Sequence, residues 1–89
     1  MTRYAVPTQV LMARLEGQEV LLNPETGMYH LVNETGRAVL EALRSGRTTE
    51  EAAEDLVART GAPPVQVAVD VRTFVEALLA RELLAEVEA

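Results

Sequence analysis

Residues 21–36 read LLNPETGMYHLVNETG, and they contain a turn, a short apolar run and a helix start in succession. Asn23, Pro24 and Gly27 suit a short hairpin loop, because proline presets φ and glycine can take a positive φ. The run that follows, GMYHLV, predicts a strand, and Asn33 is placed to cap a helix. The stretch therefore marks the change from a sheet before it to helices after it.

Strands are expected upstream of this stretch. Apolar residues lie close together between Val6 and Leu22 without the 3.6-residue spacing of a helix. Glu16 and Gly17 interrupt them with a turn signal. The sequence predicts a three-stranded antiparallel meander over residues 5–15, 18–23 and 27–32.

Helices are expected downstream. The first runs from the Asn33 cap to about Arg44, with Gly46 placed to end it. The second begins with the capping box Thr48 and Glu51 and stops at Gly61. The third, over residues 64–82, starts at the proline pair 63–64. We expect one α+β domain, residues 1–89, with an N-terminal three-stranded antiparallel sheet whose one face is covered by the three helices.

Composition excludes several kinds of function. The chain has no cysteine and a single histidine, so neither thiolate chemistry nor a metal site is expected. Its glycines are scattered, which gives no phosphate-binding loop, and we expect no cofactor. The residues also offer no acid, base and nucleophile set, so an enzyme is not expected.

The net charge and the hydropathy of the chain predict which partners it has and where it is located. Fourteen acidic against eight basic residues give a net charge of -6, which repels nucleic acid. No apolar run approaches the roughly 20 residues of a membrane span, and no secretory signal is visible. We expect a cytoplasmic protein that binds neither nucleic acid nor membranes.

The last predicted strand has an unprotected edge. It ends the meander, so one side lacks a neighbouring strand, and it carries neither proline nor lysine to block pairing. An extended peptide could pair there by strand addition. Tyr29 and Leu31 share one face of this strand, while Met28, His30 and Val32 share the other. An ordinary edge strand without a ligand is the alternative.

The third predicted helix has more apolar surface than a core stripe needs. A stripe about 100° wide contains Val67, Val71, Phe74, Val75 and Leu78. Ala68 and Leu79 widen one flank, and Ala77, beside Asp70 and Arg81, extends the other. We therefore expect another segment to lie alongside this helix.

The order of four motifs resembles the PqqD-like proteins. These motifs are Tyr29-x-Leu31-x-Asn33, Thr35-Gly36-x-Ala38-Val39-Leu40-x-x-Leu43, Gly46-Arg47-Thr48-Thr49-Glu50-Glu51 and Asp70-Val71-x-x-Phe74-Val75-x-x-Leu78. The resemblance extends from about Val6 to Leu84. It departs from the family at Glu82, where a glycine usually precedes the final Leu-Leu, and this raises a question about where the third helix ends.

The resemblance implies a winged-helix-like recognition element for ribosomally made, modified peptides. Such an element binds the leader of a precursor peptide without catalysis and hands the precursor to a leader peptidase or another modifying enzyme. The chain is most similar to the stand-alone leader-binding component of lasso peptide biosynthesis, with PqqD proper and related pathways as alternatives. A winged-helix DNA-binding regulator is a further alternative, although residues 64–82 offer only Arg72 and Arg81 against three carboxylates.

The resemblance also implies where the leader binds. It would add as a strand to the backbone of Met28, Tyr29, His30, Leu31 and Val32, with His30 and Val32 near it. The helical wall would consist of Val67, Asp70, Val71 and Phe74, and Asp70 could accept a hydrogen bond or pair with a basic leader residue. Periodicity gives each element two faces and does not say which one meets the leader.

Overall fold

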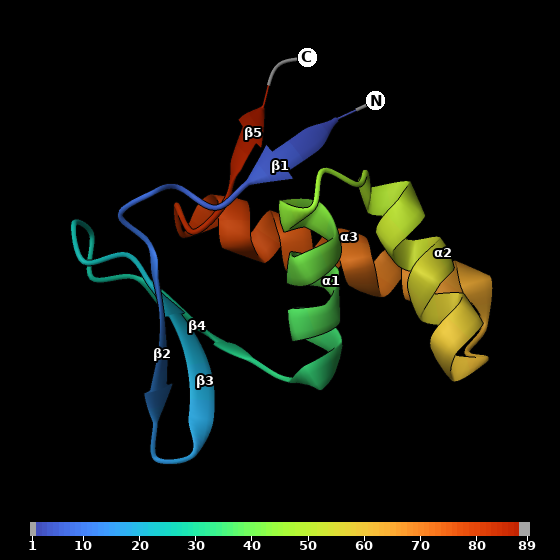
Figure 1. Ribbon diagram of the computed structural model, residues 1–89, viewed down its shortest axis with the longest axis horizontal. Helices are drawn as coiled ribbons and strands as arrows, with labels where there is room; N and C mark the ends of the chain where they lie inside the picture. Colours follow the sequence, from blue (N-terminus) through green and yellow to red (C-terminus); the bar gives the residue numbers. More distant parts are fainter. Residues whose placement is uncertain (1, 88–89) are drawn as a thin grey trace.

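A computed structural model describes residues 2–87 of the chain (Figure 1). Its elements follow in the order β1 (Arg3–Ala5), β2 (Leu11–Leu15), β3 (Gln18–Leu22), β4 (Tyr29–Val32), α1 (Glu34–Arg44), α2 (Thr49–Thr60), α3 (Pro64–Ala80) and β5 (Ala85–Val87). The predicted α+β class, with a three-stranded sheet ahead of three helices, is confirmed.

The sheet is the expected antiparallel meander in the order β2-β3-β4. Leu11 lies opposite Leu22, which in turn lies opposite Tyr29. Between β2 and β3 the chain turns at Glu16 and Gly17, whose φ angles are 51° and 82°. Two positive φ values at the centre of a two-residue loop are typical of the type I′ turn, whose twist matches that of the strands.

The first predicted strand, over residues 5–15, is in fact two strands. Pro7 has no N–H, and its carbonyl accepts a turn hydrogen bond from the Val10 N–H at 3.0 Å, which separates β1 from β2. β1 pairs instead with β5, placing Arg3 opposite Val87 and Ala5 opposite Ala85. β5 was not predicted. Figure 1 shows this second pair, β1 and β5, beside the helices.

The predicted helix caps are confirmed. The Asn33 side chain accepts a hydrogen bond from the Gly36 N–H at 2.8 Å, at the start of α1. At the start of α2, Thr48 and Glu51 form both hydrogen bonds of a capping box. Gly61 ends α2 in the left-handed conformation, with φ of 69°. These local signals explain why the helix starts could be read from the sequence.

α3 ends at Ala80, two residues before its predicted end. Glu82 takes a left-handed φ of 55°. The Glu82 N–H donates to the Leu79 carbonyl at 3.1 Å, and the Leu83 N–H donates to the Leu78 carbonyl at 2.9 Å. This pair of bonds is a Schellman motif, which ends a helix with a left-handed residue that is usually glycine.

The helices do not all cover the sheet, contrary to the prediction. α1 follows β4 and lies beside it, and α2 packs against α1 and α3 on the side away from the sheet (Figure 1). One continuous core nevertheless joins Leu21 of the sheet to the helices. The large side chains of this core that are 1% exposed or less are Leu21, Leu40, Leu43, Leu78 and Leu83.

None of the helices within residues 2–87 combines the length and the apolar character that crossing a membrane requires.

Candidate functional site

β4 has one open edge. It pairs with β3 on one side, and no other strand of residues 2–87 pairs with it. The Asn23 N–H donates to the Met28 carbonyl at 2.9 Å, and this bond sets the alternation along the ladder. His30 and Val32 therefore face β3 with their backbone groups, while the N–H and C=O groups of Tyr29 and Leu31 point away from it. This outward row is available to another extended chain.

The side chains of β4 divide between two faces. His30 is half-buried and Val32 is 7% exposed, so this face meets the helices. Tyr29 and Leu31, 59% and 55% exposed, stand on the opposite, outer face of the sheet. The structure thus settles which face is which, a question that period-two alternation leaves open.

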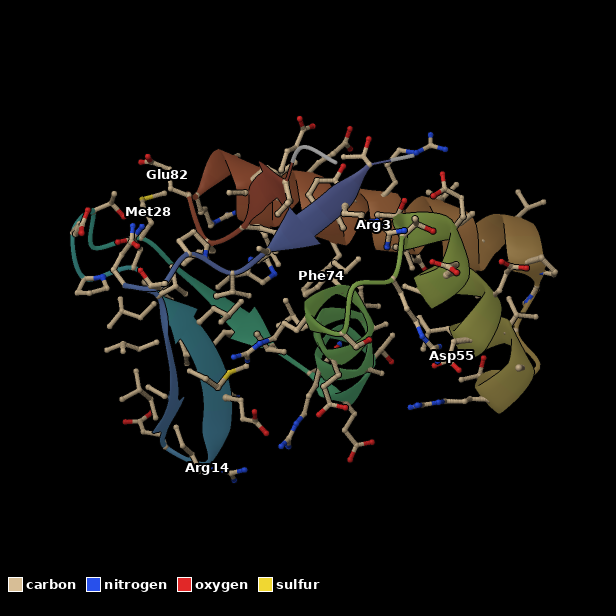
Figure 2. All side chains as sticks on the ribbon, turned by 45° about the horizontal axis from the view of Figure 1, so that its top comes forward. Arg3, Arg14, Met28, Asp55, Phe74 and Glu82 are labelled. Atoms are coloured by element: carbon tan, nitrogen blue, oxygen red, sulfur yellow. The ribbon has the colours of Figure 1, made fainter. Side chains whose placement is uncertain are left out.

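One side of α3 faces the β4 edge. Asp70, Phe74, Ala77 and Arg81 recur at spacings of three and four residues and so share this side. The half-buried ring of Phe74 meets the ring of His30 edge to face, with centroids 5.8 Å apart and an interplanar angle of 68°. Figure 2 shows Phe74 in the space between α3 and α1. This ring pair connects the strand to the helix.

Two hollows meet at the ring pair. The strand hollow, of about 460 Å³, runs along residues 27–31 and reaches Arg81. The helix hollow, of about 320 Å³, lies between the start of α1 and the middle of α3. Its lining residues are Asn33, Thr35, Gly36, Val39, Leu56, Asp70, Val71 and Phe74. His30 lines the first hollow and Phe74 the second, and we call the two hollows together the cleft.

The structure brings most of the predicted site residues together in the cleft. Those that line it are Met28, Tyr29, His30, Leu31, Asp70, Val71 and Phe74. Val67 and Val32 line neither hollow, because both are buried in the core at 6% and 7% exposure. Val71, at 3% exposure, offers only a small part of the floor.

Asn23 is a positioning residue that sequence reasoning missed. Its side chain is 2% exposed. Its amide Nδ2 donates to the Glu82 carbonyl at 2.9 Å, and its Oδ1 accepts from the Glu25 N–H at 3.0 Å. Asn23 thereby ties the turn before β4 to the end of α3, the end at which Figure 2 labels Met28 and Glu82. In the sequence, Asn23 before Pro24 signals only a turn.

Gly36 was also missed as a site residue. A Cβ added at Gly36 would lie 3.1 Å from two carbons of the Phe74 ring. This separation is too short for ordinary van der Waals contact, so the absence of a side chain lets the ring lie against the first turn of α1. The motif Thr35-Gly36 pointed to this position but not to its contact.

The cleft carries opposite charges at its two ends. At one end, the Asp70 carboxylate accepts a hydrogen bond from Gln66 Nε2 at 2.8 Å. At the other end, Arg81 Nη1 donates to the Ala77 carbonyl at 3.2 Å. Burial and then the Arg81 charge lower the pKa of His30 from its ordinary value of 6.5. The imidazole is therefore neutral at neutral pH and packs as an aromatic ring.

A larger hollow lies next to the cleft, between the β2–β3 turn and the start of α1, with a volume of about 650 Å³. Three of its four charged side chains already pair with one another, because Glu19 Oε1 lies 3.5 Å from Arg14 Nη2 and 2.7 Å from Arg37 Nη1. We therefore place the candidate site in the cleft.

The chemistry of the cleft suits binding. It offers backbone donors and acceptors, two rings and two separated charges. Within the described part of the chain, no cluster of three or more histidine, cysteine or acidic side chains could hold a metal ion. The site is an open strand edge beside a helix in a small α+β domain, an arrangement that suits an extended chain.

Comparison with known proteins identifies the family. Residues 18–84 match the family described as Coenzyme PQQ synthesis protein D (PqqD), and the chain belongs to this family. The family resemblance that the motifs predicted is therefore confirmed.

A curated relative and two solved structures support this assignment. The PqqA binding protein of Rhizobium meliloti (strain 1021) is 39% identical over 70 residues, which cover 79% of this chain and 69% of the relative. The structure of TbiB1 in complex with the TbiA(beta) leader peptide superposes with a TM-score of 0.77 at 27% identity, covering 94% of this chain and 98% of TbiB1. Lasso peptide synthetase B1, complexed with the leader peptide, has a TM-score of 0.81 at 18% identity, covering 93% and 98%, and shows the same fold.

Proposed function

We propose that this protein binds the leader region of a ribosomally synthesised precursor peptide and presents the precursor to a modifying enzyme. Three findings support the proposal: membership of the PqqD family, a relative named for binding PqqA, and the likeness to TbiB1, which was solved with a leader peptide. The role is one of binding without catalysis, as expected from the residues and in agreement with the family.

The leader binds as an added strand on β4. The open row of N–H and C=O groups at Tyr29 and Leu31 is the observation that carries this proposal. A peptide paired there leaves no main-chain group of the edge unsatisfied. Every second leader side chain then faces the cleft, where it meets the rings of His30 and Phe74.

The charged ends of the cleft define which leader fits. Asp70 and Arg81 are separated by about 16 Å along the axis of α3, given a rise of 1.5 Å per residue. An extended peptide covers that distance in about five residues. The fitting leader therefore has a basic residue near Asp70, an acidic residue about five positions away near Arg81, and apolar side chains between them.

The domain then acts by raising the local concentration of its cargo. Holding the leader near an enzyme makes the later encounter of enzyme and core peptide effectively intramolecular. We propose a leader peptidase of the lasso peptide type as the receiving enzyme, with another modifying enzyme as the alternative.

Calorimetry on one edge position tests the proposal. The probe is the synthetic leader of any short precursor-like peptide that a neighbouring gene encodes, with the PqqA and TbiA(beta) peptides as a comparison of pathways. A dissociation constant between micromolar and nanomolar is expected. Leu31→Pro removes one outward N–H at an edge where proline is tolerated, and should weaken binding by about tenfold or more.

Leu31→Thr is the matched control, because it changes the same side chain and keeps the N–H. It should bind far more tightly than the proline variant. Equal affinities for the two variants would reject strand addition, and no binding of any of the three peptides at high micromolar concentration would reject leader recognition.

The structure gives no support to the alternative that this protein binds DNA. Arg72 of α3 is exposed, but so are Asp70 and Glu76 of the same helix. A recognition helix needs several cations for phosphate contacts, and this one is acidic on balance.

A further inference from the structure

The outer face of the three-stranded sheet is apolar and carries no charge. The register places Ala13, Val20 and Leu31 side by side on this face, and alternation along each strand supplies the rest. The outer face consists of Leu11, Ala13, Leu15, Gln18, Val20, Leu22, Tyr29 and Leu31. Such a face is unusual in a chain of which 25% is charged.

The side chains at the centre of the outer face are buried or half-buried, and those at its corners are exposed and project further. The face therefore has a low centre and raised corners. Val20 is only 2% exposed, and its neighbour Ala13 is half-buried. Around them stand Leu11, Leu15, Tyr29 and Leu31, between 52% and 60% exposed. Figure 1 shows the helices beyond the β4 side of the sheet, and these exposures show that no element of residues 2–87 covers this face.

We propose that the outer face pairs with the outer face of a second copy of this chain, giving a two-fold dimer of face-to-face sheets. A two-fold axis brings the same patch of both copies together, so one patch must complement itself. The raised Leu and Tyr side chains of one copy fit over the low Ala13–Val20 centre of the other. Each copy has a net charge of -6, but the face has no charged residue. The contact between the two sheets therefore brings no like charges together.

The area of the face sets the strength of this dimer. Soluble monomers rarely expose apolar patches above a few hundred Å², and this one is on the order of 500 Å². Two such patches bury about 1,000 Å² together, which is the lower limit for a specific interface. The dimer is therefore weak and forms at micromolar concentrations or above.

The dimer contact adjoins the leader site without covering all of it. Tyr29 and Leu31 belong both to the outer face and to the strand hollow, whereas the outward backbone row of β4 lies at the sheet edge and the helix hollow lies on the inner side. The inference does not depend on leader binding, and its failure would leave the proposed function unaffected.

Sedimentation velocity of the full chain tests the inference. The wild-type protein should shift from monomer towards dimer between about 5 μM and 1 mM. Leu15→Glu and Leu11→Glu each put a charge at a corner of the face and should remain monomeric over that range. Val65→Glu is the matched control, because Val65 is 79% exposed on α3 and away from the sheet, and it should dimerise like the wild type.

Circular dichroism shows whether each variant is folded. An NMR dilution series of the wild-type protein tests the dimer without any substitution. Amide shifts should move with concentration for β2, β3 and β4 and not for α2. A wild-type protein that stays monomeric at about 1 mM would overturn the inference. A dimer that folded Leu15→Glu and Leu11→Glu still form would also overturn it, as would dilution shifts located on the helices.

Discussion

Glu82 holds a backbone conformation that suits glycine. A non-glycine residue in the left-handed region costs about 1–2 kcal/mol, and Glu82 has a φ of 55°. Its carbonyl, which accepts the Asn23 hydrogen bond, is unaffected by the identity of the side chain. We expect Glu82→Gly to raise the free energy of unfolding by about 1 kcal/mol, after the entropy that glycine adds to the unfolded chain.

Urea denaturation measures this change in the free energy of unfolding, provided that the dependence of that free energy on urea concentration is the same in both proteins. Ala80→Gly, at the last helical residue of α3, is the control and should lower the free energy of unfolding by about 1 kcal/mol. Equal losses in both variants would show that Glu82 is not strained.

The His30 ring, which lines the cleft, changes its charge with pH. Burial and the Arg81 charge lower its pKa in the folded protein below 6.5. At pH values between the lowered pKa and 6.5, the unfolded chain binds more protons than the folded protein. The stability that the neutral ring contributes is therefore fully present above pH 6.5. That stability is lost as the pH falls through the lowered pKa.

NMR titration reads the His30 pKa directly, since the chain has a single histidine. It should lie below 6.5, and Arg81→Gln should move it upwards because a repelling charge is removed. A pKa above 6.5 in the wild type would contradict the buried, neutral ring.

At the scale of elements, β4 should show alternating amide protection. The N–H groups of His30 and Val32 face β3 and should exchange slowly in the free protein, whereas those of Tyr29 and Leu31 should exchange fast. Adding the leader should slow Tyr29 and Leu31 selectively. Hydrogen exchange followed by NMR measures this, and unchanged exchange at Tyr29 and Leu31 in the bound state would reject pairing at this edge.

The contact between α1 and α3 depends on Gly36. Gly36→Ala gains helix propensity but places a Cβ 3.1 Å from the Phe74 ring. The half-buried ring can move into the helix hollow, so the free energy of unfolding should change by less than about 1 kcal/mol. The hollow becomes smaller, and calorimetry should show about fivefold or greater loss of leader affinity. Unchanged affinity would place the leader outside the helix hollow.

Elements with local signals could be predicted from the sequence, and those without could not. Asn33, Thr48 with Glu51, and Gly61 each fix a helix end by a hydrogen bond or a φ value of their own. β1 and β5 are three residues long and form only because the two ends of the chain meet. No local pattern reports such a long-range pairing.

The candidate site was predictable to the same extent. The open edge of β4 follows from its position as the last strand, and the structure agrees. The orientation of β4 could not be predicted, because Tyr29 and Leu31 are as apolar as the buried Val32. Asn23 and Gly36 act through contacts with Glu82 and Phe74, far away in the sequence, and only the folded chain shows them.

At the scale of the whole molecule, α3 separates two environments. Asp70, Phe74 and Arg81 face the cleft. On the other flank, Ala68 and Leu79 line a hollow shared with Tyr4 of β1 and Glu86 of β5. The surplus apolar surface predicted for this helix thus meets the ends of the chain on one flank and the cleft on the other.

This division predicts what shortening the chain does. Removing residues 85–89 deletes β5, whose residues are all exposed, but keeps Leu83 and Leu84, which are 0% and 3% exposed. β1 loses its partner strand yet remains held by the hydrogen bond from Arg3 Nη1 to the Gly46 carbonyl. The free energy of unfolding should fall by about 1 kcal/mol or less, because little apolar surface becomes exposed.

Leu83→Ala in the full-length chain is the comparison, and it should cost about 3 kcal/mol because it leaves a cavity in the core. The shortened chain should bind the leader within about twofold of the wild type, since the cleft lies on the opposite flank of α3. Denaturation and calorimetry on the two variants measure both effects. A shortened chain that folds but binds several-fold more weakly would place β5 in leader recognition and require a second contact on the far side of α3.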